Sequence, residues 1–424
     1  MDCTESTRLS RRHLLKGGAA SLALWGFMPR TALGAARDPR LLTIVLRGGL
    51  DGIAMAAPVG DPAYASLRGA IAVPASGTGA GLPLDSLFAL NLNMPFLHGL
   101  YLKREALIVH AVATPYRGRS HFDGQDVLES GLPGVVRADD GWLNRALAGL
   151  PKGDKVAPRK GLSMGAVVPL VIRGGAPVLS WVPKTYNLPL REQTIARLLD
   201  LYNVTDPRLS KALTEGLEID RVATASAAAP AVSPAGSGAM ASVAAAPASG
   251  ARPFAEFIGA AEAAARFLST ADGPRIGALS YNGWDTHANE GVINGLLANR
   301  LAGLDAAIKT FAEGMGAAWK ETVVVIVTEF GRTARVNGTA GTDHGTATAA
   351  VLAGGAVKGG RVVSDWPGLA EKALYEGRDL APTRDLRGVL KGVLSDHLGI
   401  PEGALAKAVF PESGAVKPEA GLIG

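Results

Sequence analysis

The sequence predicts an α/β fold in which a central, mostly parallel sheet is flanked by helices. Three continuous apolar runs, at 41–46, 106–112 and 322–327, lack the polar alternation of half-exposed strands and therefore indicate strands buried on both faces. A weaker run covers 276–281. Helical patterns at 253–268 and from about 291 to 319 separate the later runs. Strands that alternate with helices are typical of parallel sheets.

Composition agrees with a large folded core and excludes one class of partner. The 424 residues are 47% hydrophobic and 19% charged, which is enough apolar material for an extensive interior. The formal net charge is +5, but residues 1–35 hold five basic and two acidic side chains, a net of +3, which leaves +2 for the rest. A chain with so small a basic excess is not expected to bind nucleic acid.

The first 35 residues have the pattern of a twin-arginine signal peptide. Arg11 and Arg12 precede a short apolar stretch at 17–28, which is below the ~20 residues that span a membrane, and small residues follow at 32–36. We expect the twin-arginine translocase and a signal peptidase as partners, and a periplasmic or secreted location. An uncleaved anchor is the alternative. The single cysteine, Cys3, lies in this segment, so the expected mature chain has no disulfide.

Residues 222–252 consist almost entirely of Ala, Pro, Ser, Gly and Val and show no helical period. Such a composition predicts a disordered surface insertion within a single domain covering 36–424. A linker between two domains is the alternative.

Acidic and histidine side chains follow the predicted strands. They are Asp51 after the first, Asp285 and His287 after the third, Glu329 after the fourth, and Asp343 and His344 soon after that. Because ligands of open parallel sheets bind beyond the carboxyl ends of the strands, we expect these side chains at one rim. Carboxylates and imidazoles together predict a divalent metal, with Zn, Mn, Ca or Mg as candidates and histidine favouring the transition metals. A cation would also relieve repulsion among the carboxylates.

Each of these residues also has a structural interpretation. They are a turn at Asp51, a helix cap formed by Asp285 or His287, a local ion pair between Glu329 and Arg332, and a tight loop at Asp343–His344.

Five segments together resemble the landmarks of an uncharacterised bacterial family, the domain of unknown function 1501. They are LRGGLDG, RSHFDGQDVLESG, GWDTHANE, VTEFGRTARVNG and GTDHGTATAAVLAGG. A twin-arginine signal is also typical of that family, which is placed with the alkaline phosphatase and sulfatase superfamily. The resemblance implies an alkaline phosphatase-like sandwich with a metal site at the rim of its sheet.

The resemblance also implies roles for single residues. Asp51 corresponds to the acidic ligand after the first strand, and Ser120 to the nucleophile at the start of a helix. Three features depart from the superfamily pattern. The Asp-x-x-x-His of the phosphatases is shortened to Asp285-Thr286-His287, Phe330 stands where the Asp-His pair would have its histidine, and the sulfatase motif Cys-x-Pro-x-Arg is missing.

The leading functional hypothesis is a metal-dependent hydrolase of phosphate or sulfate esters, acting on a small molecule or a polymer. The hydroxyl of Ser120 or Thr114 would attack, and Arg332 or Arg119 would stabilise the developing charge. Ser120 as a plain helix N-cap is the structural alternative.

Three further residues, His110, His121 and Asp123, are candidates for a ligand or a base. The competing hypothesis is a non-catalytic member of the fold that acts in binding or in envelope assembly.

Overall fold

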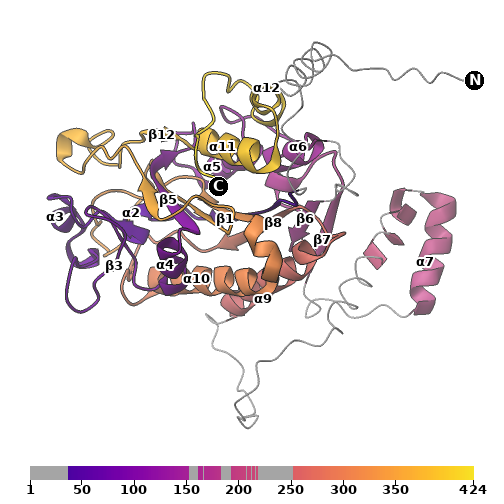
Figure 1. The fold of residues 1–424 in the computed structure, drawn as a ribbon, viewed down its shortest axis with the longest axis horizontal. Coiled ribbons are helices and arrows are strands. Elements are labelled where there is room, and N and C mark those ends of the chain that lie inside the picture. Colours follow the sequence, from indigo (N-terminus) through magenta and orange to yellow (C-terminus); the bar gives the residue numbers. More distant parts are fainter. Residues whose placement is uncertain are drawn as a thin grey trace, which may run out of the picture. The chain divides into compact units, whose positions relative to one another are not determined.

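A nine-stranded sheet forms the centre of the chain, in the order β11-β5-β10-β9-β1-β8-β6-β7, with β12 pairing with β5 (Figure 1). Every pair in it is parallel except those that β10 makes with β9 and β5. Its strands are β1 (Arg40–Arg47), β5 (Ala106–Ala113), β6 (Gly161–Met164), β7 (Val178–Trp181), β8 (Ile276–Asn282), β9 (Thr322–Thr328), β10 (Thr348–Ala353), β11 (Arg361–Val363) and β12 (Arg384–Asp385). The prediction of a mostly parallel α/β sheet is confirmed, as are all four predicted strands.

The structure is a computed structural model that describes residues 37–151, 161–165, 167–182, 192–206, 208–211, 213–214, 216–217 and 252–424. Within it, Pro39–Gly424 make up one unit. The predicted signal peptide and residues 222–251 of the predicted insertion lie outside the described residues.

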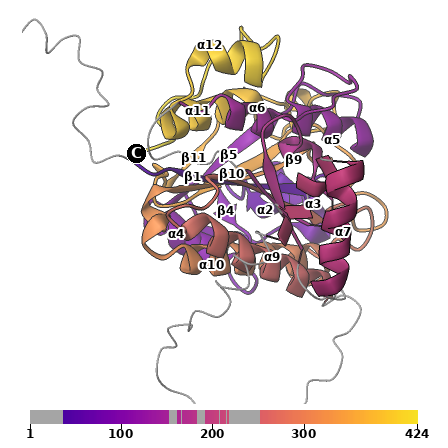
Figure 2. The same cartoon turned by 90° about the vertical axis from the view of Figure 1, so that its right-hand side faces the viewer.

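Helices cover both faces of the sheet. The helices are α2 (Gly52–Met55), α3 (Tyr64–Arg68), α4 (Pro95–Leu102), α5 (His121–Ser130), α6 (Trp142–Ala148), α7 (Glu192–Thr205), α9 (Arg252–Ser269), α10 (Leu296–Met315), α11 (Leu386–Leu398) and α12 (Glu402–Ala404). Helices α4, α9 and α10 lie on one face, and α5, α6 and α11 on the other (Figure 2). Both helices predicted from the sequence are present, as α9 and as α10 with a following 3₁₀ helix at Gly316–Glu321.

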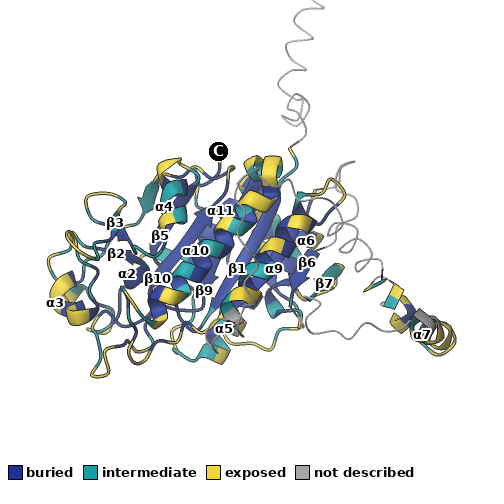
Figure 3. Cartoon of the chain, turned by 90° about the horizontal axis from the view of Figure 1, so that it is seen from below, coloured by how far each residue is buried: buried dark blue, intermediate teal, exposed yellow. Residues whose placement is uncertain are grey.

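Strand β1 shows why its sequence has no polar alternation. Leu42 and Ile44 pack in the core beneath α9 and α10, whereas Leu41 and Val45 pack in the core beneath α6 and α11. Each face of the strand is therefore buried, and Figure 3 shows the central strands as buried behind α9 and α10. A strand in this position is mostly apolar on both faces, and Thr43 is the one polar residue between Leu41 and Leu46.

A second, smaller sheet lies in the described part of the chain. Strands β2 (Ala56–Ala57), β4 (Ala89–Leu90) and β3 (Leu82–Pro83) form a separate antiparallel sheet. Among the described helices, none combines the length and the apolar character needed to cross a membrane.

Candidate metal centre

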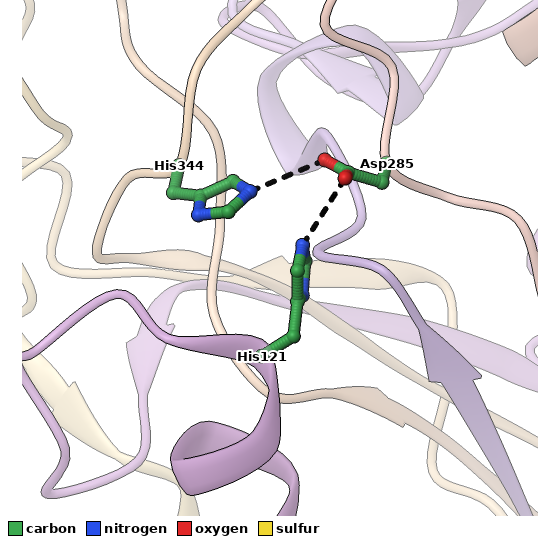
Figure 4. Close-up of side chains that lie close together, drawn as sticks. All are labelled: His121, Asp285 and His344. Carbon is green, nitrogen blue, oxygen red and sulfur yellow. Dashed lines mark hydrogen bonds and ion pairs between the residues drawn. The ribbon is translucent and has the colours of Figure 1, made fainter.

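Three side chains meet at the rim where the parallel strands end. His121 is the first residue of α5, which follows β5; Asp285 lies in the segment after β8; and His344 lies in the segment between β9 and β10. One ligand atom from each lies within 4.8 Å of the other two (Figure 4). The rim predicted for the site is therefore where the imidazoles and the carboxylate gather.

The contacts in this cluster converge on the carboxylate of Asp285. Its Oδ1 lies 3.2 Å from Nε2 of His344, and its Oδ2 lies 3.4 Å from Nε2 of His121. Nε2 of His287 lies 3.0 Å from Asp285 Oδ1 and 3.0 Å from Nε2 of His344. Three of the predicted ligands, Asp285, His287 and His344, thus lie together.

The opposite nitrogen of each ring is held by an oxygen. The Nδ1 partners are Glu329 Oε1 at 2.8 Å for His121, Asp343 Oδ1 at 3.1 Å for His287, and the carbonyl oxygen of Arg119 at 2.8 Å for His344. Because a carboxylate or a carbonyl oxygen can only accept, Nδ1 is the donor in each case. Each neutral ring therefore turns the lone pair of Nε2 toward the other rings, which is the arrangement of metal-bound histidines.

This arrangement fits a metal ion. The lone pairs of Nε2 of His121 and His344 face the carboxylate oxygens of Asp285 at 3.4 and 3.2 Å, and such a group repels unless a proton or a cation lies among its atoms. Nε2 of His121 is buried and has no hydrogen-bond partner among the described residues. Two imidazoles and one carboxylate are also the ligand set of many catalytic zinc and iron sites, which keep a further position open.

Arg332 fixes Asp285 in the cluster. Its Nη1 donates to Asp285 Oδ1 at 2.6 Å, while its other nitrogens donate to the hydroxyl and the carbonyl oxygen of Thr342. Burial acts to raise the pKa of Asp285, but the hydrogen bond and the charge of Arg332 outweigh it and hold that pKa below its usual value. Asp285 is therefore ionised, and the fully buried Arg332 orients it.

Glu329 lies behind His121 rather than beside Asp285. Its Oε1 accepts from the backbone N–H of Gly48 at 2.8 Å and from Gln125 at 3.1 Å, as well as from His121. Burial opposes ionisation, but these hydrogen bonds lower the pKa of Glu329. The same hydrogen bond raises the pKa of His121, and burial lowers the pKa of His344. The structure thus places Glu329 and Asp343 as partners of histidine rings, with no contact that makes either one a member of the close group of ligand atoms.

Gly48 lies where the segment after β1 and the segment that carries Asp285 come too close together for a side chain. Its φ is +123°, and a Cβ on it would lie 2.6 Å from the backbone nitrogen of Asp285. A side chain at this position would displace the segment that carries Asp285.

Asp51 belongs to a different cluster. Its carboxylate caps α2 by accepting from Ala54 N at 3.0 Å, and it forms a fully buried ion pair with Arg68. Burial and then the charge of Asp51 raise the pKa of the neighbouring Glu290 to about 8. Among the described residues, no hydrogen bond or ion pair joins Asp51 to His121, Asp285 or His344, so Asp51 as a metal ligand stays a prediction.

The predicted nucleophiles have structural partners. Ser120 Oγ accepts from Asp123 N at 3.5 Å and caps α5, and Thr114 Oγ1 donates to the carbonyl oxygen of Glu329 at 3.3 Å. Arg119 binds Asp379 and Glu376. The capping interpretation of Ser120 therefore describes its contacts.

From the sequence, His121 is one of three further candidates for a ligand or a base, and the structure brings it into the cluster. The available signal was its position: the first residue of a helix that follows a parallel strand faces the same rim as the ends of the other strands. Phe330, the residue in place of an expected histidine, stacks on His121 with ring centroids 4.9 Å apart and so forms an apolar wall of the cluster.

The sheet and the cluster define an α/β protein with a candidate metal centre of two histidines and one aspartate. The model of the family described as protein of unknown function (DUF1501) matches residues 105–400, and the chain belongs to that family. No curated protein matches the chain. A solved structure, the crystal structure of Ps i-CgsB in complex with k-i-k-neocarrahexaose, is 10% identical with a TM-score of 0.38, covering 90% of this chain and 75% of that one.

Proposed function

We propose that this protein is an exported, metal-dependent hydrolase of phosphate or sulfate esters. The observation that carries the proposal is the convergence of Nε2 of His121 and His344 on the carboxylate of Asp285, with every Nδ1 held by an acceptor. These three residues would hold the metal. Imidazole ligands favour zinc, manganese or iron over calcium and magnesium.

A bound divalent ion would act as a Lewis acid toward an ester oxygen and lower the pKa of a water molecule. The residues around it supply the remaining parts. Arg332, paired with Asp285 at 2.6 Å, would keep that carboxylate ionised and oriented as a ligand.

His287 is the residue placed to move a proton. Its side chain is 45% exposed, its Nε2 faces the cluster, and its Nδ1 is bound to Asp343. In hydrolysis the oxygen of water bonds to phosphorus or sulfur and the bond to the alcohol oxygen breaks. His287 would take the proton from water and return it to the departing alcohol, with Asp343 fixing the ring.

The test is an assay of purified protein that has been stripped of metal and reloaded with one ion at a time. p-Nitrophenyl phosphate, bis-p-nitrophenyl phosphate and p-nitrophenyl sulfate represent the three ester classes. We expect one ion to restore activity, His344→Ala to lose the metal, and His287→Ala to keep the metal while losing about 10²–10⁴-fold in rate. Lys103→Ala, at an exposed position remote in sequence from the cluster, is the matched control.

A metal-loaded protein that cleaves none of these esters would favour the second candidate, a non-catalytic metal-binding protein. The observation on its side is that the hydroxyls of Ser120 and Thr114 are both engaged in structural hydrogen bonds.

The alkaline phosphatase-like form of the fold and export are parts of the same proposal. The order of the elements supports the former: an acid after β1, a serine at the start of α5, an Asp-x-His segment after β8 and a histidine before β10. The Arg11-Arg12 pattern supports export through the twin-arginine translocase, with cleavage by a signal peptidase. Replacing both arginines by lysine should abolish the appearance of the mature chain in the periplasm, as judged by cell fractionation; normal export of that variant would contradict the proposal.

A further inference from the structure

A cavity of about 500 Å³ lies beside the candidate metal centre. Phe122, which directly follows His121, lines it, as does Gln125, which donates to the same oxygen of Glu329 that His121 contacts. Asn282, three residues before Asp285, lines it from the end of β8. Helix α5 therefore carries residues of both the cavity and the cluster.

The side chains that line the cavity carry as many positive as negative charges. Arg47 forms an ion pair with Glu129, and both line the wall. Of the other two charged residues, Arg173 donates to the carbonyl oxygen of Val168 and Asp126 has no ion pair among the described contacts. One cation and one anion remain, so the cavity does not select a ligand body of high net charge.

The polar side chains that line the cavity can form hydrogen bonds with hydroxyl groups of a ligand. The side chain of Asn282 is exposed and has no hydrogen-bond partner in the part of the chain that the structure describes, and Ser280 Oγ is a buried atom without one. The amides of Asn282 and Gln125 and the hydroxyl of Ser280 can both donate and accept, while Arg173 donates and Asp126 accepts, so the lining can match the mixed donor and acceptor character of vicinal hydroxyls. A site built from such groups discriminates strongly against molecules that lack the hydroxyls.

An aromatic ring stands at the edge of this polar set. Phe122 is 86% exposed, although it carries a large apolar face that a folded protein usually covers. Val167, 75% exposed, also lines the cavity. A ligand with one apolar face and an edge of hydroxyl groups matches both parts of the lining, and a sugar ring has this character.

We infer that the cavity binds a sugar residue of low net charge, which places an ester on that sugar at the metal centre. This inference rests on the proposed function for the orientation of the ester only. The volume is within the range of small-molecule sites and is larger than a phosphate or sulfate group alone requires.

The first experiment measures binding without catalysis. Neutral hexasaccharides of glucose, galactose, N-acetylglucosamine and xylose are titrated calorimetrically into metal-free and metal-loaded protein. We expect at least one to bind both forms, with Phe122→Ala and Arg173→Ala each weakening binding at least tenfold. Both side chains are exposed, so neither change should unfold the protein; Leu102→Ala and Arg197→Ala, exposed residues of α4 and α7, are the matched controls.

Binding of none of the four saccharides, or binding that both cavity variants leave unchanged, overturns the inference. So does an unstructured peptide that binds in the cavity while the saccharides do not. A protein that binds saccharide but hydrolyses no ester would contradict the proposed function and leave the sugar site standing.

A separate experiment tests whether the ester group of the bound sugar reaches the metal centre. In metal-loaded His287→Ala protein, which should bind an ester without cleaving it, the sulfated or phosphorylated form of the bound saccharide should bind at least tenfold more tightly than the neutral form. Equal affinity would show that the ester does not reach the metal centre.

Discussion

Two clusters of carboxylates lie at the ends of neighbouring strands, and they balance their charge in different ways. Around Asp285 the partners are histidine rings as well as the guanidinium of Arg332, and the group is open to solvent on one side. Around Asp51 the partner is Arg68, and all three of Asp51, Arg68 and Glu290 are fully buried. Both clusters thus contain a guanidinium, but only around Asp285 do ring nitrogens also turn their lone pairs toward the carboxylate.

An acidic residue that follows a strand does not by itself indicate a metal site. A buried carboxylate needs a counter-charge, and a guanidinium from a nearby helix supplies it as well as an ion does. Nε2 atoms that converge on a carboxylate are more informative, because a folded protein gains little by turning their lone pairs toward a negative charge.

The largest effect is expected at the internal cation. Arg68→Met would leave Asp51 and the raised-pKa acid Glu290 buried without a positive partner, and breaking a buried pair in this way costs about 3–5 kcal/mol. Urea unfolding of metal-free protein measures it. Arg197→Met, on α7, is the control for removal of an arginine as such. A loss below about 1 kcal/mol, the value of a surface pair, would show that solvent reaches the Asp51 cluster.

His110 is a core histidine whose Nε2 is held by a backbone acceptor, in contrast to the Nε2 atoms around Asp285. His110 in β5 is fully buried, its Nε2 donates to the carbonyl oxygen of Ala56 at 3.0 Å, and burial lowers its pKa to about 4. The unfolded chain takes up this proton near pH 6.5 and the folded chain only near pH 4. Stability is therefore complete above pH 6.5 and falls as the pH drops toward 4, by roughly 3 kcal/mol.

Urea unfolding of wild type and His110→Gln at pH 7.5, 6.0, 5.0 and 4.5 tests this. The variant should start lower, because it loses the ring packing against Phe88, but should show a flatter decline. Parallel curves for the two proteins would mean that His110 does not titrate in this window.

The metal response separates the two clusters directly. A ligand that binds only the folded state adds about 2.7 kcal/mol at a hundredfold excess over its Kd. Added metal should therefore raise the Tm of wild type, and His344→Ala and Asp285→Asn should abolish that rise. Asp51→Asn should have a lower baseline Tm yet keep the full rise, since Arg68 is its partner. Loss of the rise in Asp51→Asn would instead make Asp51 a ligand, as the sequence pattern predicts.

The sheet and the rim were accessible from the sequence because they follow from local patterns. Apolar runs such as Thr322–Val327 identify buried strands, and the polar residues just after them fall at one edge of a parallel sheet. Asp285, His287 and His344 were found in this way. The partner of Asp51 was not, because Arg68 lies in a short separate helix and only the packing of that helix brings its guanidinium to the carboxylate.

The smallest effect concerns Ser120, the residue that both a nucleophile and a helix cap would explain. As a cap with a 3.5 Å hydrogen bond to Asp123 N, its replacement by alanine should cost about 0.5–1 kcal/mol of stability and leave the rate per metal-loaded molecule within about twofold. Removing a serine nucleophile from a hydrolase lowers kcat by on the order of 10⁶. Loss of a cap therefore lowers the free energy of unfolding, whereas loss of a nucleophile lowers kcat.

Ser120→Asn completes the test, because asparagine caps helices as well as serine does but has no hydroxyl to attack an ester. If Ser120 only caps α5, Ser120→Asn should recover the stability lost in Ser120→Ala, and both variants should hydrolyse the active ester at the wild-type rate. If both variants are folded and metal-loaded but inactive, the hydroxyl is the nucleophile. The hydrogen bond to Asp123 would then be a resting contact that the serine leaves during the reaction, and His287 would lose its role as the base toward water.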